Sequence, residues 1–435
     1  MKMILESREI PVRGSYDVVV AGAGVAGLAA AVAARRAGRN VLLLEKSCEL
    51  GGLATLGQIN YFVPMCNGSG RQVVRGLCDE FIRLSIRYGY DVMPEEWRAG
   101  EPGENAAHRY SVRYSACMFA LALTELIHDE RVDLLFDTVA SEPVMDGGRC
   151  RGLIVENKSG RSFYEAGVVV DATGDADILF RAGVPTVQGL NYFTYSAYGI
   201  DVEHCRRAAE TGRIEKAVFD MAGGRANLYG KNHPEGHPFY TGTSGEDVTR
   251  YLIDNQLELL HRIGEDDRAS REVISLPGMC QFRTTRHIDG DYTLRQADVY
   301  RHFEDSVTAV CDFEHKGDFL WEVPYRALVR TGFDNLITAG RTVAAEDYAW
   351  DVMRVIPPAI VTGQAAGLAA AQALEQDRPI HAIDVGLLQR TLEKQNVLLH
   401  YDDAWAKENR EDVMRFTKLD AKGGTPYVAG SHDGL

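Results

Sequence analysis

Three glycines near the start of the chain have the spacing that binds the phosphates of a dinucleotide. Gly22, Gly24 and Gly27 form the pattern G-x-G-x-x-G. The first glycine permits a tight turn, the second lets the backbone approach a pyrophosphate, and the third lets a helix pack against the preceding strand. Glu45 closes the next apolar run, where a carboxylate can bind ribose hydroxyls. These four residues predict a dinucleotide site, and nicotinamide and flavin cofactors share the pattern.

A second group of reactive side chains lies far along the chain, in the sequence RTTRH at residues 283–287. Arginine can hold a carboxylate through two parallel hydrogen bonds, and histidine can exchange a proton near neutral pH. We therefore expect Arg283 or Arg286 to anchor an anionic substrate and His287 to act as an acid or base. The alternative is an ion-pair network that ties two lobes together. Arg354 is a further candidate, and its role is open between contact with a ligand and support of the fold.

The first glycines require a strand before them and a helix after them. Residues 18–21 are Val-Val-Val-Ala, which is typical of a strand buried on both faces. Residues 27–37 are rich in alanine and predict a helix that ends at Gly38, and residues 41–44 predict a second strand. The N-terminus of such a helix offers N–H groups and a positive dipole end to a phosphate. The order of these elements predicts a Rossmann-like unit.

Other segments repeat this association of apolar runs with glycine. A glycine-rich loop occupies residues 49–57, directly after the second predicted strand. Residues 168–177, VVVDATGDAD, and residues 335–341, NLITAGR, each predict a buried strand followed by a turn. Residues 357–371, PPAIVTGQAAGLAAA, predict a helix with prolines at its start. Turn signals between residues 147 and 160 predict short antiparallel strands.

The length of the chain and a change in its residue composition predict two lobes. The chain has 435 residues, more than one small core can use. Residues 186–318 are rich in tyrosine, histidine, arginine and polar loops. We predict an α/β fold whose discontinuous first lobe, residues 1–185 and 319–435, holds a parallel sheet and a β-meander. Residues 186–318 would form an inserted α+β lobe that contacts the substrate.

Composition argues against several classes of protein. The formal net charge is −15, so we expect no nucleic-acid partner, although a local basic pocket for an anionic substrate is compatible with it. No run of about 18 apolar residues is free of charge, so we expect no membrane span. The first residues do not resemble a signal peptide, and we expect a cytoplasmic protein. A homo-oligomer is compatible with the sequence.

The cysteines and histidines give no metal-site pattern. None of the eight cysteines forms C-x-x-C, which argues against a structural zinc site and against disulfide chemistry. His233 and His237 have the spacing H-x-x-x-H, but proline and glycine lie between them and no third ligand is visible. We therefore expect no metal. Cys48 and Cys66 would be candidates for covalent attachment of a cofactor, whereas most free cysteines only fill space.

With these residues in view, the chain resembles flavoproteins of the glutathione-reductase-type FAD fold. It is most similar to the broad family of FAD-dependent oxidoreductases related to the flavoproteins of fumarate reductase and succinate dehydrogenase. The segments that carry the resemblance are residues 18–46 with the Gly-Gly that follows, residues 168–177, 335–341 and 357–371, and more weakly residues 281–294. They cover the first predicted lobe and leave the second, where the substrate would be chosen, poorly covered.

The resemblance implies FAD as the cofactor and a set of residues that would bind it. In chain order the implied residues are Gly22, Gly24, Gly27, Glu45, Lys46, Gly51, Gly52, Thr55, Val139, Ala172, Thr173, Gly174, Gly340, Arg341, Gln364 and Gly367. Among them, Val139 would meet the adenine and Arg341 the ribityl chain. Gln364 and Gly367 would lie at the start of the last long helix, whose positive end would stabilise negative charge on the flavin.

The resemblance also implies an oxidoreductase. We expect a hydride to move between a small organic substrate, which the arginines allow to be anionic, and flavin N5. The electron donor or acceptor is open. A flavin monooxygenase that uses a separate hydride source is an alternative. Another is an FAD-carrying electron-transfer subunit of a complex, which would have no substrate pocket of its own.

Overall fold

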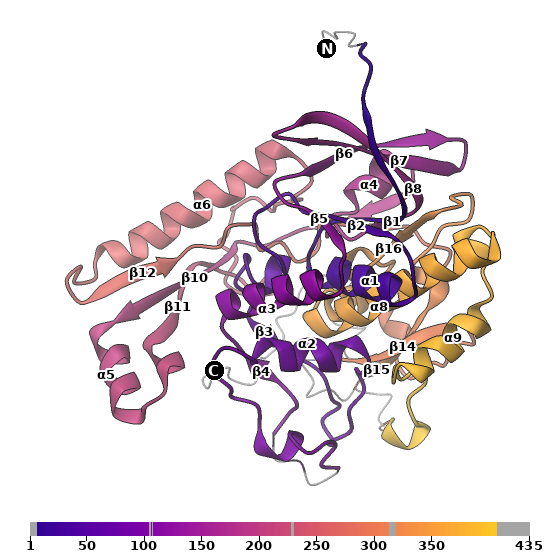
Figure 1. Ribbon diagram of the computed structural model, residues 1–435. Coiled ribbons are helices and arrows are strands. Elements are labelled where there is room, and N and C mark those ends of the chain that lie inside the picture. Colours follow the sequence, from indigo (N-terminus) through magenta and orange to yellow (C-terminus); the bar gives the residue numbers. More distant parts are fainter. Residues whose placement is uncertain (1–6, 104–105, 107, 228–229, 313–318, 407–435) are drawn as a thin grey trace.

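A seven-stranded mixed sheet forms the centre of the molecule (Figure 1). The computed structural model describes residues 7–103, 106, 108–227, 230–312 and 319–406. The sheet contains, in spatial order, β5 (Asp133–Leu135), β2 (Val41–Leu44), β1 (Val12–Ala21), β8 (Gly160–Asp171), β7 (Arg149–Asn157) and β6 (Val139–Asp146), and β16 (Leu336–Thr338) also pairs with β8. This architecture confirms the predicted α/β class with a parallel core and an antiparallel meander.

The parallel strands end at one level. Ala21, the last residue of β1, is paired with Leu44 of β2 on one side and with Asp171 of β8 on the other. Asp171 is in turn paired with Thr338 of β16. The residues that follow these four strands therefore emerge at the same edge of the sheet, and these are the glycine-rich segments of the sequence.

Two helices pack together against this sheet. They are α1 (Val25–Arg36) and α8 (Ile356–Gln376). Gly363 and Gly367 of α8 permit the contact, because a Cβ atom at these positions would lie 2.1 Å from the carbonyl oxygen of Ala26 and 2.2 Å from that of Ala30. The helix predicted over residues 27–37 begins two residues earlier, at Val25. The prolines predicted at the start of α8 lie inside its first turn.

A smaller antiparallel sheet forms a second unit, which lies to the left of the central sheet in Figure 1. It consists of β10 (Thr194–Asp201), β11 (Val218–Arg225) and β12 (Arg271–Ser275), with α5 (Val202–Thr211) and α6 (Gly245–Gly264). The residues of its own hydrophobic cluster lie between Phe193 and Phe282 in the sequence. Ile288 and Val310, which the predicted second lobe also includes, are buried in the main core instead. The boundaries of the predicted lobes, 186–318 and the remainder, stay a prediction.

The remaining elements connect these sheets or cover them. The remaining strands are β3 (Tyr61–Phe62), β4 (Val112–Arg113), β9 (Thr186–Gln188), β13 (Arg286–Ile288), β14 (Ser306–Cys311) and β15 (Leu320–Pro324). The helices are α2 (Leu77–Ser85), α3 (Ala116–Asp129), α4 (Asp177–Arg181), α7 (Asp347–Met353) and α9 (Val385–Lys394). Within the described ranges no single helix is long and apolar enough to cross a bilayer; α7 and α8 together meet that criterion by length and composition, but with a bend of 80° between them.

The contact between α1 and α8 gives a test of the fold. We expect Gly367→Ala to lower the free energy of unfolding by about 1–3 kcal/mol, because the new methyl group would overlap the Ala30 carbonyl. Gly264→Ala is the matched control, since Gly264 ends α6 and a Cβ there meets nothing within 4 Å. Denaturant unfolding of both variants measures the difference. Equal stability of Gly367→Ala and the parent would contradict this account of the contact.

Candidate functional site

A cavity of about 530 Å³ lies where the parallel strands end. This volume is within the usual range of small-molecule sites, roughly 300–1,000 Å³. The predicted residues that line it are Gly22, Gly24, Glu45, Lys46, Gly51, Gly52, Val139, Ala172, Thr173, Gly174, Gly340, Arg341 and Arg354. The shared strand register therefore brings together segments that are more than 300 residues apart in the sequence.

The three glycines of the first motif have three different structural roles. Gly22 has φ +96°, and a Cβ there would lie 2.5 Å from the carbonyl oxygen of Ala172. Gly27 lies behind the wall, where a Cβ would come within 1.9 Å of the Gly22 carbonyl oxygen. Gly24 has φ −66°, and a Cβ there would meet nothing within 4 Å. Gly24 therefore leaves space that belongs to the cavity, as a pyrophosphate requires.

The first turn of α1 faces the cavity with its positive end. Val25 and Ala26 line the wall, no side chain caps the helix at Gly24, and the first turn carries no acidic residue. The N–H groups of a helix start attract an anion, and the helix dipole adds to the attraction. This end of α1 can hold a phosphate group.

Glu45 is fixed at the edge of the cavity by backbone donors. One carboxylate oxygen accepts a hydrogen bond from Ala23 N at 2.8 Å, and the other accepts one from Ser47 N at 2.8 Å. The side chain is 7% exposed and lines the cavity. An ionised carboxylate has further lone pairs, so Glu45 can also accept hydrogen bonds from ribose hydroxyls.

Four cationic side chains line the cavity although the chain as a whole is acidic. They are Lys46, Arg181, Arg341 and Arg354. Arg341 donates from Nε to the Gly174 carbonyl and from Nη2 to Asp175 Oδ1 at 2.8 Å. Arg354 donates from Nε to Asp351 Oδ1 at 2.8 Å, and its side chain is 15% exposed. Carboxylates thus orient two of the guanidinium groups at the wall.

Asp171, which the sequence analysis did not single out, shapes the loop behind the cavity. It is fully buried and accepts hydrogen bonds from Thr173 N, Thr173 Oγ1, Ile178 N and Leu179 N at 2.7–3.0 Å. Burial raises the pKa of the Asp171 carboxyl, and the hydrogen bonds from Leu179 and Thr173 act in the opposite direction. Its place at the last position of a buried strand was the signal that could have identified it.

The predicted catalytic group of residues 283–287 lies outside the cavity wall. Arg286 donates to Asp177 Oδ1 at 3.2 Å and to the Asp175 carbonyl at 3.1 Å, and its guanidinium lies 4.1 Å from the centre of the Phe180 ring. Thr285 donates to Asp175 Oδ1 at 2.7 Å. Thr285 and Arg286 therefore hold the loop between β8 and α4 through these contacts.

His287 and Arg283, the other candidates of this segment, contact other parts of the chain. His287 is 1% exposed, its Nδ1 donates to the Ile288 carbonyl at 2.7 Å, and its ring lies edge-on to Trp350. Burial lowers the pKa of this imidazole, so the ring is neutral near pH 7. Arg283 donates its backbone N–H to Asn191 Oδ1 at 2.6 Å. The substrate and acid–base roles expected for these residues stay predictions.

Three other predicted cofactor residues lie behind the wall. Thr55 Oγ1 donates to the Leu50 carbonyl at 2.5 Å, and Gln364 accepts from Leu77 N at 2.9 Å. Gln364 and Gly367 are not at the start of their helix, because α8 begins at Ile356. At that start Ile356 and Ala359 line the cavity instead.

The wall also contains residues that the sequence analysis missed. They are Val25, Ala26, Leu44, Ser47, Leu53, Ala54, Leu56, Thr138, Ala140, Asp177, Arg181, Gly278, Met279, Ala339, Ile356 and Ala359. Most of them adjoin a predicted residue, so extending each motif by a residue or two would have found them. Gly278 and Met279 follow β12, and Gly278 N donates to the Leu56 carbonyl at 2.9 Å. No local sequence pattern predicts this long-range contact.

The candidates for covalent attachment and for a loop metal site find no support in their surroundings. Cys48 and Cys66 do not line the cavity, and burial raises the pKa of the Cys66 thiol to about 11. His233 uses both ring nitrogens, since Nδ1 accepts from Phe193 N at 3.1 Å and Nε2 donates to the His237 carbonyl at 3.0 Å. His237 contacts the Tyr240 hydroxyl at 2.7 Å.

Comparison with known proteins gives one family and several distant relatives. A family model described as FAD dependent oxidoreductase matches residues 17–194 and 196–392. L-aspartate oxidase of Mycobacterium bovis is 29% identical over 197 residues, which cover 39% of this chain and 37% of that protein. Digeranylgeranylglycerophospholipid reductase of Methanoculleus marisnigri is 25% identical over 179 residues, which cover 40% of this chain and 43% of that protein.

A thioredoxin reductase of Ureaplasma parvum is 32% identical over 80 residues, 18% of this chain and 26% of that protein. The chain therefore spans less than half the length of the curated relatives it matches. Among solved structures, the Sdh1 complex of Mycobacterium smegmatis in the apo form has a TM-score of 0.43 and 16% identity, over 88% of this chain and 72% of that chain.

The family and the cavity agree on the cofactor. FAD carries a pyrophosphate and a ribose, and the cavity has space at Gly24 beside a helix N-terminus, with the Glu45 carboxylate at its edge. The family model covers well over half of the chain. On these grounds the chain belongs to the FAD dependent oxidoreductases.

Proposed function

We propose that the protein transfers a hydride between a small anionic organic substrate and N5 of FAD. The observation that carries this proposal is Arg354, a mostly buried guanidinium that Asp351 orients in the cavity wall. Arginine forks match carboxylates, and the ion pair with Asp351 fixes the position of this guanidinium at the cavity wall. An anionic substrate group is the partner that this geometry favours.

Other parts of the cavity wall supply a positive helix end and an apolar surface for the reaction. When bound, the flavin ring exchanges the hydride with the substrate. The first turn of α8, with Ile356 and Ala359 in the wall, directs a positive dipole end at the cavity and favours negative charge there. Leu56 and Met279 give the wall apolar surface, which excludes water from a hydride-transfer site.

The test is an anaerobic titration of the flavin-loaded protein. Carboxylates, alcohols and amines are added in turn, and bleaching of the flavin absorption band reports reduction. We expect bleaching by carboxylates whose α or β carbon can lose a hydride. Bleaching only by NAD(P)H, stimulated by a substrate and followed by oxygen consumption once air is admitted, would favour a monooxygenase. Reduction only in the presence of a co-purifying protein would favour an electron-transfer subunit, and either result would overturn the proposal.

Gly24 tests the cofactor site without disturbing the fold. We expect Gly24→Val to reduce bound flavin from about one per chain to less than about a tenth, because the side chain would fill the space for the pyrophosphate. Gly245→Val is the control, since a Cβ at Gly245 also meets nothing within 4 Å but lies on α6. Absorption spectra of protein and denatured supernatant measure the flavin. The melting temperature of Gly24→Val should equal that of parent protein stripped of flavin, and full flavin content would refute the assignment.

Arg354 tests the substrate contact. We expect Arg354→Gln to keep its flavin and to lose about ten- to hundredfold in kcat/KM for the anionic substrate, as the loss of a charged hydrogen bond predicts. Arg262→Gln is the matched control, because Arg262 forms a similar ion pair with Glu258 on the surface of α6. A neutral analogue of the substrate should react equally with Arg354→Gln and the parent. Unchanged kcat/KM with the anionic substrate would assign Arg354 to the fold instead.

A further inference from the structure

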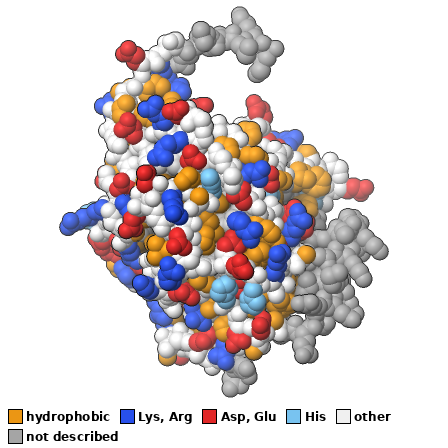
Figure 2. All heavy atoms as spheres, turned by 90° about the vertical axis from the view of Figure 1, so that its right-hand side faces the viewer, with side chains coloured by type: hydrophobic (Ala, Val, Ile, Leu, Met, Phe, Trp, Pro, Cys, Tyr) orange, Lys and Arg blue, Asp and Glu red, His pale blue; other side chains and the backbone are white. Residues whose placement is uncertain are grey.

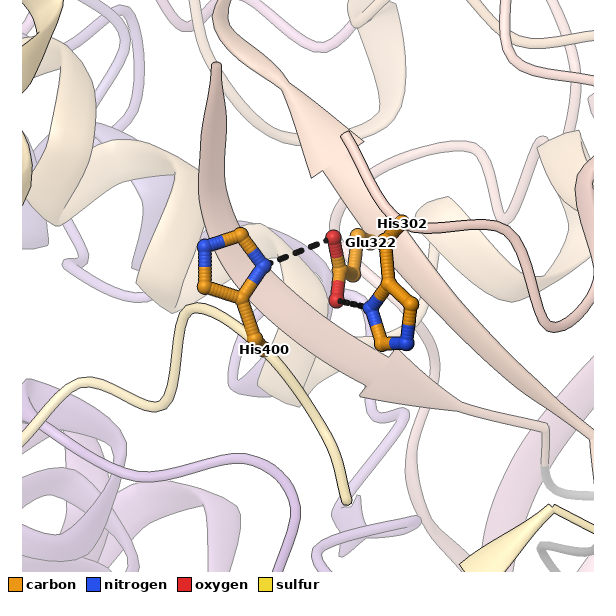
Figure 3. A group of neighbouring side chains, drawn as sticks. All are labelled: His302, Glu322 and His400. Carbon is orange, nitrogen blue, oxygen red and sulfur yellow. Dashed lines mark hydrogen bonds and ion pairs between the residues drawn. The ribbon is translucent and has the colours of Figure 1, made fainter. Parts of the chain in front are cut away.

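A cluster of three side chains with metal-ligating atoms lies away from the cavity (Figure 3). Glu322 belongs to β15, His302 lies ahead of β14, and His400 lies on the segment that follows α9. His302 Nδ1 is 2.5 Å from Glu322 Oε1, and His400 Nδ1 is 2.9 Å from Glu322 Oε2. Figure 3 shows the carboxylate between the two imidazole rings, with both Nδ1 atoms directed at it.

The carboxylate at the centre of this cluster needs a positive partner. Glu322 is fully buried, and the backbone N–H of Phe303 donates to its Oε2 at 2.7 Å. Burial of an ionised carboxylate is costly unless a cation or several donors compensate it. The two imidazoles that contact Glu322 remain 42% and 46% exposed, so an ion from solvent can reach the same atoms. Figure 2, which views this side of the molecule, shows histidine side chains at the surface.

Both ring nitrogens of His302 face carboxylates. Its Nε2 lies 2.9 Å from Asp403 Oδ1, and its Nδ1 faces Glu322. A neutral imidazole carries only one N–H, so one of these contacts would set a lone pair against a carboxylate oxygen. A second proton or a metal ion at Nδ1 removes that repulsion. The ring also stacks on Tyr401, which holds its plane in place.

We propose that His302, Glu322 and His400 form a binding site for a divalent transition-metal ion of the zinc class. Two imidazole nitrogens and one carboxylate oxygen are ligands that zinc accepts, with a fourth position left for water. Asp403 would fix the orientation of His302 from its other nitrogen, as outer carboxylates do at many histidine–metal sites. The ligand atoms already lie within 4.8 Å of one another.

The required movement is small. Ligand atoms around a tetrahedral zinc ion with bonds of about 2.0 Å lie about 3.3 Å apart. The ligand atoms of this cluster start between 2.5 Å and 4.8 Å apart, so no pair must change its separation by more than about 1.5 Å. Rotation of the two half-exposed imidazole rings can provide this. Zinc would bind the Nδ1 lone pair of two neutral rings, each of which keeps its single proton on Nε2. A ring that was protonated on both nitrogens releases one proton to solvent, and no redox change is involved. The ion would join the segment of His400, already held through hydrogen bonds from Ser306 and Ala309, more firmly to β14 and β15.

The proton alternative has the opposite pH dependence. Asp403 and Glu322 raise the pKa of His302 above its usual value. A protonated His302 alone would therefore stabilise the fold fully below the unfolded pKa of about 6.5, and the effect would disappear as pH rises through the folded pKa. Metal binding instead strengthens as pH rises, because the ligand nitrogens must lose protons. The direction of the pH effect therefore distinguishes a metal from a proton.

The test is calorimetric titration of the flavin-loaded full chain with zinc chloride in excess Mg²⁺. At about pH 7.5 we expect one site of micromolar affinity or tighter, weakened at least tenfold at about pH 5.5. His302→Gln and His400→Gln should each weaken binding by about a hundredfold, and Asp403→Asn by about tenfold. His128→Gln is the matched control, because His128 is 87% exposed and also contacts a carboxylate.

Either of two results would overturn the proposal. One is the absence of a one-to-one zinc site in the parent protein. The other is unchanged affinity in both His302→Gln and His400→Gln, which would place the zinc elsewhere on the surface. Flavin absorbance identical to that of the parent shows that the variants are folded. Glu322 is left unchanged, because a substitution at this fully buried position would disturb the fold itself.

Discussion

The common end level of four parallel strands is the constraint on which the rest of the structure depends. Hydrogen bonding sets Ala21 beside Leu44 and Asp171, and Asp171 beside Thr338. A shift of one residue would exchange the two faces of a strand and move its following turn away from the others. Because the register is fixed, four separate turns reach one edge, and ligands of open α/β sheets bind at the carboxyl ends of the strands.

The contact between α1 and α8 adds electrostatics to this geometry. Glycines let the two helices approach closely, and both helices start at the edge where the strands end. Two positive dipole ends therefore act on one cavity, together with four cationic side chains. This arrangement explains how a chain with a net charge of −15 can hold an anionic cofactor. The net charge describes the surface as a whole and does not describe one concave site.

The sequence was most informative where function depends on a few neighbouring residues. Gly22, Gly24 and Glu45 were predicted because each follows a strand that its apolar pattern reveals. Gly278 and Met279 were missed because their place in the wall depends on a contact with Leu56, more than 200 residues away. His302, Glu322 and His400 were missed for the same reason, since 20 and 78 residues separate the two histidines from the glutamate. Residue type indicates which partners are chemically suitable, and only the fold decides which of them is near.

The segment at residues 283–287 shows why an arginine-rich motif is ambiguous. Arg286 is almost fully buried, so it needs a carboxylate, and Asp177 provides one. Asp175 in turn binds Thr285 and Arg341, which lines the cavity. Buried ion pairs contribute little net stability, because desolvation offsets the attraction, but they fix geometry. Through this network the chain beyond β12 holds the loop of Gly174 in place, so any movement of that segment changes the wall of the cavity. The shape of the cavity therefore depends on how residues 283–287 pack.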